Sequence, residues 1–189
     1  MKKTAVLIYD SFCNFEISVA LEILAMAEKE TVVFAKSKEA VKSEDGLLIM
    51  SNKSIDEVVI DEYDSLILPG AADIRSAIED EDIIEFIRKF EEKVIGAISI
   101  APILLVKAGL LKGKPFMAGI NKEELLEEGF SEQDLKKMIG WYDNLANPVP
   151  EGYIITEKVI TSVSYNFVRW GLAFAKMLGI DIPSQTFGI

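Results

Sequence analysis

Short apolar runs rich in β-branched residues alternate along this chain with longer segments of helical periodicity. The apolar runs occupy residues 5–9, 31–35, 65–68, 94–98 and 159–161, and the main helical segments occupy residues 16–29, 83–90, 102–109 and 166–178. Strands that alternate with helices form βαβ units, in which successive strands lie parallel. The alternation therefore predicts an α/β fold built on a mostly parallel sheet.

The chain of 189 residues is long enough to bury one sizeable core. Because no internal repeat or linker interrupts it, we expect a single domain over residues 1–189. Residues 47–50 are expected to belong to a small hairpin, residues 116–118 to form a short strand, and residues 154–155 to pair with residues 159–161. We interpret the polar stretch 140–152, with its two prolines, as a long loop.

Composition excludes several classes of partner and cofactor. The chain has 20 Lys and Arg against 31 Asp and Glu, a net charge of −11, and such a chain repels the phosphate backbone of nucleic acids. It has no histidine and one cysteine, Cys13, which excludes an intrachain disulfide and argues against zinc or iron–sulfur sites. We therefore expect no metal, no cofactor and a reducing, cytoplasmic location. No charge-free run approaches the ~20 residues that span a membrane, so we expect no membrane partner.

The segment from Val94 to Leu105 has the outline of a nucleophile elbow. An apolar run ends at Ser99, and Pro102 begins a helix three residues later. Such a strand-to-helix turn holds one side chain over the end of a sheet and needs small residues two positions to either side of it. Ala97 and Ala101 meet this need. The position is built for a reactive residue, but the chain has no imidazole to deprotonate a serine.

Two further segments end predicted strands and should lie at the same edge of the sheet as Ser99. Residues 10–16 lead from the first strand into the first helix and contain Glu16, and residues 66–72 contain Gly70. Parallel sheets carry their sites at the carboxyl ends of their strands. Taken singly, Glu16 is more simply a helix-capping charge, Gly70 a turn glycine and Ser99 a small turn residue. Their occurrence together, in this order, favours a functional site.

Four motifs make the chain resemble the ThiJ/PfpI superfamily of DJ-one-like proteins over nearly its whole length. In family order they are Phe12…Glu16…Leu21-Glu22, then Tyr63-Asp64-Ser65-Leu66-Ile67-Leu68-Pro69-Gly70, then Ala97-Ile98-Ser99-Ile100-Ala101-Pro102, and finally Val159-Ile160-Thr161-Ser162 before the last helix. No single motif is specific, and the resemblance rests on all four in sequence. It implies a flavodoxin-like three-layer sandwich of the class I glutamine amidotransferase-like type, and a homodimer.

Carried over position by position, the resemblance places Ser99 where the family has its reactive cysteine. It places Glu16 where the family has the acid that tunes that cysteine. The turn at Gly70 and the N–H groups of Ala71 and Ile100 take the oxyanion-binding or ligand-binding positions. The departures from the family pattern are Ser99 for the cysteine, Ile100 for the histidine of protease-like members, Ala71 for a second glycine, and Gly119 near the position of another histidine.

The exchange of cysteine for serine changes the chemistry that the resemblance implies. A serine hydroxyl does not ionise without a general base, and a carboxylate of ordinary pKa, as expected for Glu16, is a poor one. We therefore expect thiol-dependent activities, such as glyoxalase or deglycase chemistry, to be absent at Ser99. Cys13 is interpreted as a packed loop cysteine rather than a relocated reactive thiol.

Three hypotheses for the function follow. The first is a protein that binds a small polar or carbonyl ligand in the pocket of Ser99 and Glu16 without thiol catalysis. The second is a hydrolase or amidase in which Ser99 is the nucleophile. The third is a hydratase or lyase in which Glu16 is the general acid and base and Ser99 only orients the ligand.

Overall fold

Seven strands form one central sheet in the structure, a computed structural model that describes residues 1–189. The strands are β1 (Lys3–Leu7), β2 (Thr31–Ala35), β5 (Lys53–Ser54), β6 (Tyr63–Leu68), β7 (Val94–Ile98), β10 (Ile154–Thr156) and β11 (Val159–Ser162). Their order is β10-β11-β7-β6-β1-β2-β5. Every neighbouring pair is parallel except β10 and β11, which are antiparallel at one edge.

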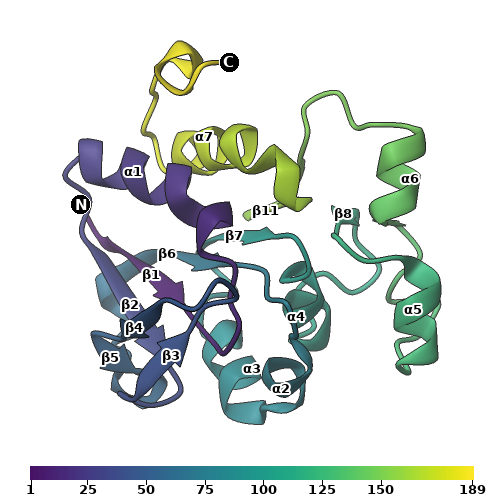
Figure 1. Cartoon of the computed structure of the whole chain (residues 1–189), viewed down its shortest axis with the longest axis horizontal. Coiled ribbons are helices and arrows are strands. Elements are labelled where there is room, and N and C mark those ends of the chain that lie inside the picture. Colours follow the sequence, from purple (N-terminus) through teal and green to yellow (C-terminus); the bar gives the residue numbers. More distant parts are fainter.

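Helices cover both faces of this sheet (Figure 1). On one face lie α1 (Ser18–Met26) and α7 (Phe167–Met177), which pack against each other. On the other face lie α2 (Arg75–Glu79), α3 (Glu81–Arg88) and α4 (Pro102–Lys107). The predicted three-layer α/β sandwich with a mostly parallel sheet is confirmed. None of the helices is both long enough and apolar enough to cross a membrane.

Smaller elements surround the sandwich. An antiparallel hairpin consists of β3 (Ala40–Lys42) and β4 (Leu48–Met50), and a parallel pair consists of β8 (Phe116–Met117) and β9 (Met138–Ile139). Two further α-helices are α5 (Lys122–Glu127) and α6 (Trp141–Ala146), and the 3-10 helices are η1 (Asn14–Ile17), η2 (Ile55–Glu57), η3 (Ile60–Glu62), η4 (Ser164–Asn166) and η5 (Ser184–Phe187). The predicted hairpin, the short strand near residue 116 and the pairing of residues 154–155 with 159–161 are confirmed.

The central strand β7 is packed tightly against α7. The sequences of central strands are continuous apolar runs because helices cover both faces of such strands. In β7, Ile95, Ala97 and Ile98 are accordingly fully buried. A Cβ atom on the glycine of this strand, Gly96, would lie 2.7 Å from the ring of Phe174 in α7. Glycine therefore allows α7 to approach β7, the strand whose carboxyl end carries Ser99.

The interpretation of residues 140–152 as one long loop is wrong, because they include α6. This helix has only six residues, too few to show a hydrophobic period. Polar contacts define it instead: the Gly140 N–H donates to the Asp143 carboxylate at 3.3 Å, and the buried Asn144 side chain accepts from the Val149 N–H at 3.1 Å. The segment thus folds through local hydrogen bonds that an apolar pattern does not reveal.

Candidate functional site

Ser99 lies in the turn between β7, which ends at Ile98, and α4, which begins at Pro102. Its backbone φ is +62°, a left-handed conformation that is uncommon and costly for a residue with a β-carbon. Two hydrogen bonds hold it: the Ser99 N–H donates to the Ser162 carbonyl at 2.8 Å, and the Ser99 carbonyl accepts from the Gly119 N–H at 2.6 Å. The expected strand-to-helix turn is confirmed, and the structure shows that its backbone is strained at Ser99.

Glu16 lies in η1, between β1 and α1, and its side chain is only 1% exposed. Its Oε2 atom accepts a hydrogen bond from the Gly70 N–H at 2.7 Å. The pKa of the Glu16 carboxyl is raised to about 7, chiefly by burial and less by the negative charge of Glu44, while hydrogen bonds from the Gly70 N–H and the Ser99 hydroxyl oppose the rise. The expectation of an ordinary pKa is therefore wrong, because the sequence does not show how deeply this side chain is buried.

Gly70 brings the loop after β6 against both of these side chains. A Cβ atom at Gly70 would lie 2.6 Å from Glu16 Oε2 and 2.6 Å from Ser99 Cβ. Only glycine permits so close an approach, since any β-carbon would overlap these atoms. The structure therefore brings Ser99, Glu16 and Gly70 together from the ends of three different strands.

We expect Gly70→Ala to destabilise the fold by about 1–3 kcal/mol, the usual cost of forcing a methyl group into a packed space. The methyl group would displace Glu16 or Ser99, and urea unfolding measures the loss. The control is Gly46→Ala, whose methyl group meets no atom within 4 Å and which reports only the backbone cost of a φ of +94°. Unchanged stability in Gly70→Ala would contradict the close approach.

Two backbone N–H groups beside these side chains have no acceptor in the protein. They belong to Ala71, next to Gly70, and to Ile100, next to Ser99. The loop that carries Ala71 is held in place by the Cys13 N–H, which donates to the Gly70 carbonyl at 2.8 Å. Backbone donors without a partner are available to an oxygen atom of a ligand.

Cys13 lies in the same loop, but its thiol is not activated. The residue is only 6% exposed. Burial, followed by the negative charges of Glu16 and Glu44, raises the pKa of the Cys13 thiol far above its usual range. Because the thiolate is the nucleophilic form, a thiol of raised pKa is unreactive at neutral pH. The structure agrees with the interpretation of Cys13 as a packed loop residue.

Comparison with known proteins identifies the family. The sequence model of the DJ-1/PfpI family matches residues 2–176. The chain belongs to the DJ-1/PfpI family. It is 33% identical over 121 residues to Protein/nucleic acid deglycase 2 of Escherichia coli, an alignment that covers 62% of this chain and 70% of that protein. It is 24% identical over 180 residues to a deglycase of Pyrococcus abyssi, with 93% of this chain and 99% of that protein covered.

Solved structures related to the DJ-1/PfpI family share the fold of this chain. A DJ-1 superfamily protein of Agrobacterium tumefaciens matches with a TM-score of 0.77 at 17% identity, covering 99% of this chain and 97% of the other. A two-domain protein of Anabaena variabilis, with dj-1/thij/pfpi-like and ferritin-like domains, matches with a TM-score of 0.78 at 20% identity. That match covers all of this chain and 52% of the other, so this chain spans about half of the two-domain protein.

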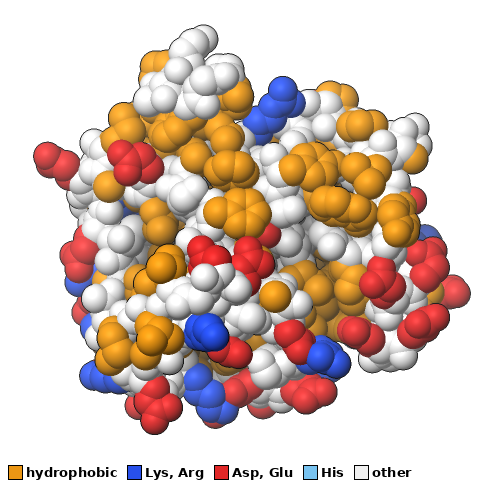
Figure 2. All heavy atoms as spheres, in the orientation of Figure 1, with side chains coloured by type: hydrophobic (Ala, Val, Ile, Leu, Met, Phe, Trp, Pro, Cys, Tyr) orange, Lys and Arg blue, Asp and Glu red, His pale blue; other side chains and the backbone are white.

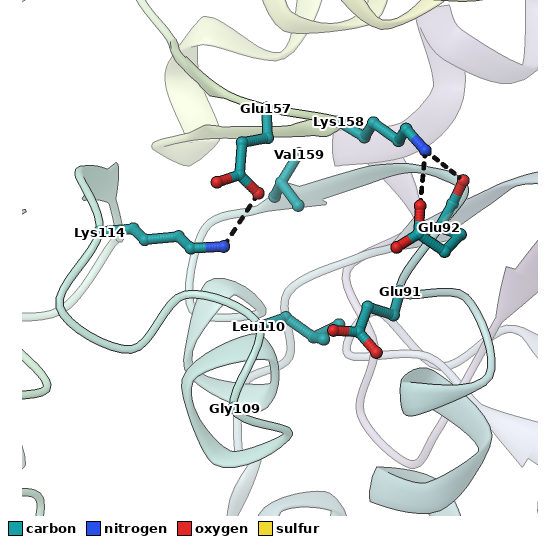
Figure 3. A pocket seen from close by; sticks show the side chains of 8 residues that line it. All are labelled: Glu91, Glu92, Gly109, Leu110, Lys114, Glu157, Lys158 and Val159. Carbon is teal, nitrogen blue, oxygen red and sulfur yellow. Dashed lines mark hydrogen bonds and ion pairs between the residues drawn. The ribbon is translucent and has the colours of Figure 1, made fainter.

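A charged pocket of about 330 Å³ lies away from Ser99, beside the amino ends of β7 and β11 (Figure 3). Four of its five charged side chains form ion pairs, Lys114 with Glu157 and Lys158 with Glu92, each at 2.9 Å, and Glu91 forms none. Because the pocket lies at the amino ends of these strands and Ser99 follows the carboxyl end of β7, the pocket is separate from the site at Ser99. No three acidic or thiol side chains converge in the structure in a way that could hold a metal ion.

Three aromatic side chains near the carboxyl edge of the sheet, those of Trp141, Tyr165 and Phe167, are not predicted from the sequence. Tyr165 of η4 packs edge-on against Trp141 of α6, with ring centroids 5.4 Å apart. Phe167 at the start of α7 packs edge-on against Phe15 of η1, with centroids 5.8 Å apart. Tyr165 follows the end of β11 within a few residues, and this position after a strand is the signal that could have identified it.

Proposed function

We propose that this DJ-1/PfpI protein binds a small polar or carbonyl ligand between Ser99 and Glu16 and performs no thiol chemistry there. The supporting observation is the buried Glu16 carboxyl, which accepts a hydrogen bond from the Gly70 N–H at 2.7 Å and lies close enough to the Ser99 hydroxyl for it to lower the Glu16 pKa, in a chain without histidine. An oxygen atom of the ligand would accept from the N–H groups of Ala71 and Ile100. With a pKa near 7, the Glu16 carboxyl is able to donate to the ligand or to accept from it.

Some relatives of this chain are named deglycases, but we do not propose deglycase chemistry at Ser99. In the motif comparison, Ser99 takes the place of the family's reactive cysteine. A hydroxyl ionises far less readily than a thiol and needs a strong general base to attack. The chain's one thiol, Cys13, is buried and protonated. A ligand that meets Ser99 is therefore held by hydrogen bonds rather than attacked.

The pKa of Glu16 favours a second candidate function. A carboxyl whose pKa is about 7 is present in both protonation states at neutral pH, which suits a general acid and base. In a hydratase or lyase, Glu16 would move the proton and Ser99 would orient the ligand. A hydrolase or amidase is the third candidate, with Ser99 as nucleophile and Glu16 as its base.

A serine-directed fluorophosphonate probe and a thermal-shift titration with acetamide separate the three candidates. We expect no labelling of the protein, and we expect acetamide to raise the melting temperature because it binds the folded state. The shift should be smaller in Ser99→Ala. Labelling that disappears in Ser99→Ala would support the hydrolase instead. Turnover of an unsaturated or hydroxylated carbonyl compound that is lost in Glu16→Gln but kept in Ser99→Ala would support the hydratase or lyase.

We also propose that the protein is a homodimer. The hairpin of β3 and β4 exposes three large apolar side chains, Leu47, Leu48 and Met50, which is typical of a surface covered by a partner. Light scattering should give twice the chain mass of 21.0 kDa, and Leu48→Glu should reduce the mass to that of one chain without unfolding it. A mass of one chain for the unaltered protein at micromolar concentration would contradict the dimer.

A further inference from the structure

Two pairs of aromatic side chains lie near the carboxyl edge of the sheet, Phe15 with Phe167 and Tyr165 with Trp141, and we call these four side chains the aromatic row. Phe15 directly precedes Glu16 and is 45% exposed, and Tyr165 is 47% exposed. Figure 2 shows hydrophobic side chains gathered on this face over α6 and over the adjoining ends of α1 and α7. Apolar and aromatic walls around a few polar groups are typical of small-molecule sites.

Both pairs of the aromatic row are edge-on. Phe15 and Phe167 meet at an interplanar angle of 82°, and Trp141 and Tyr165 meet at 73°. In an edge-on pair, the ring that contributes its edge keeps both of its own faces free for another contact. The exposed rings of Phe15 and Tyr165 therefore offer apolar surface at the edge of the sheet that carries the polar groups of the site.

A buried amide fixes the position of Tyr165. Asn144 is 1% exposed, and its Nδ2 atom donates a hydrogen bond to the Tyr165 hydroxyl. Its Oδ1 atom accepts from the Val149 N–H at 3.1 Å. Since an unpaired buried amide is costly, these bonds hold Tyr165 at a defined place relative to α6, and the ring is preorganised for a ligand.

Backbone hydrogen bonds connect the aromatic row to Ser99. The Ser99 carbonyl accepts from the Gly119 N–H at 2.6 Å, and the next residue, Ile120, accepts from the Trp141 N–H at 3.2 Å. On the other side, the Ser99 N–H donates to Ser162, the last residue of β11 before the segment that carries Tyr165 and Phe167. The row and the polar site are thus parts of one continuous edge.

Negative charge also lies at this edge. The hairpin tip packs on the loop before Glu16, where the Glu44 N–H donates to the Phe12 carbonyl at 3.0 Å. The Glu44 carboxylate is close enough to raise the pKa of Glu16. An anionic ligand would be repelled by Glu44 and by the ionised form of Glu16.

We propose that the ligand of this site is an uncharged molecule with a planar apolar group next to its carbonyl or other polar head. The inference rests on the proposed function, because the head lies at Ser99 and Glu16 while the planar group lies against the aromatic row. Stacking on an aromatic face favours a planar group over a saturated ring of similar size. The charge of Glu44 and Glu16 favours a neutral head over a carboxylate.

Four probes test the inference: benzamide, cyclohexanecarboxamide, acetamide and benzoate. We expect benzamide to bind about tenfold more tightly than cyclohexanecarboxamide or benzoate, and more tightly still than acetamide. Dissociation constants come from thermal-shift titrations, and quenching of Trp141 fluorescence is the second readout, absent in Trp141→Leu. Tyr165→Leu should remove most of the preference for benzamide, and Tyr165→Phe, which keeps the ring, should retain it. The matched control is Tyr142→Leu in α6, next to Trp141, since Tyr142 is 68% exposed and belongs to no aromatic pair.

The outcomes separate this inference from the proposed function. If all three amides bind equally, or if Tyr165→Leu behaves like Tyr142→Leu, the aromatic row takes no part and the inference is overturned while the polar site stands. If benzamide binds but neither Ser99→Ala nor Glu16→Gln weakens it, the proposed function is overturned. If no amide binds, both are overturned. Tighter binding of benzoate than of benzamide would contradict the expected neutral head.

Discussion

Replacing Glu16 with glutamine should raise the free energy of unfolding at about pH 8 by up to about 3 kcal/mol and leave it nearly unchanged at about pH 4. The pKa of Glu16 is about 7 in the folded protein, against an ordinary value of 4.5, so the folded state binds this proton more tightly than the unfolded chain. Ionisation of the buried Glu16 carboxyl therefore lowers the free energy of unfolding. This loss is absent when the pH is below the ordinary pKa, grows as pH rises from the ordinary pKa to the folded-state pKa, and is complete above the folded-state pKa. Glutamine does not ionise, and its side-chain carbonyl still accepts from the Gly70 N–H.

Urea unfolding of Glu16→Gln and of the unaltered protein across this pH range measures the effect. The difference in free energy of unfolding between the two should widen as pH rises from about 4.5 to about 7 and then stay constant. The matched control is Glu22→Gln, an exposed glutamate of α1, which should not alter the pH profile. Parallel profiles for Glu16→Gln and the unaltered protein would show that the buried carboxyl is not the source of the pH dependence.

The sandwich could be predicted from the sequence because buried parallel strands leave a strong apolar signal. The strand predicted at 94–98 has the bounds of β7, and the one predicted at 31–35 has the bounds of β2. The apolar pattern predicts the start of β6 two residues late, since Tyr63 and Asp64 do not continue an apolar run. Strand interiors are specified by burial, while strand ends depend on the pairing partner, which a single sequence does not show.

The short helices could not be predicted from periodicity. Both α5 and α6 have six residues, and hydrogen bonds to side chains determine where they begin. The capping box of Asn121 and Glu124 at the start of α5 was visible as an Asn-x-x-Glu pattern and is the one available signal. The partnership of Trp141 with Tyr165 joins segments 24 residues apart in sequence (165 − 141), and no local pattern encodes it.

The sequence was enough to predict which residues form the candidate site, but not the pKa of its carboxyl group. The order of strand ends was enough to place Ser99, Glu16 and Gly70 at one edge. The pKa of about 7 at Glu16 depends on how closely the loops around Gly70 and Ser99 enclose the carboxyl. Enclosure is a property of tertiary packing, so the sequence could suggest a carboxylate at this place but not its protonation state.

Ser99→Cys should create a thiol that iodoacetamide alkylates at least about tenfold faster than Cys13 at about pH 7, because the thiolate is the reactive form. Sulfur replaces oxygen at a half-buried position, so the variant should fold with little loss of stability. The unpartnered N–H groups of Ala71 and Ile100 are available to a thiolate. Cys13 provides an internal reference in the same molecule, since burial and neighbouring carboxylates raise its thiol pKa.

Peptide mass spectrometry after timed alkylation measures both rates at once. Adding Glu16→Leu to the Ser99→Cys variant should slow alkylation at position 99 at about pH 6, where most Glu16 carboxyls hold a proton that can be donated to the thiolate. At about pH 8, where most Glu16 carboxyls are ionised, the same substitution removes a negative charge that raises the pKa of the Cys13 thiol, so the rate at Cys13 should rise. Opposite responses of two thiols to one substitution would identify Glu16 as the group that sets their ionisation. A thiol at position 99 that reacts no faster than a free cysteine, with or without Glu16, would mean that Ser99 serves only the strand-to-helix turn.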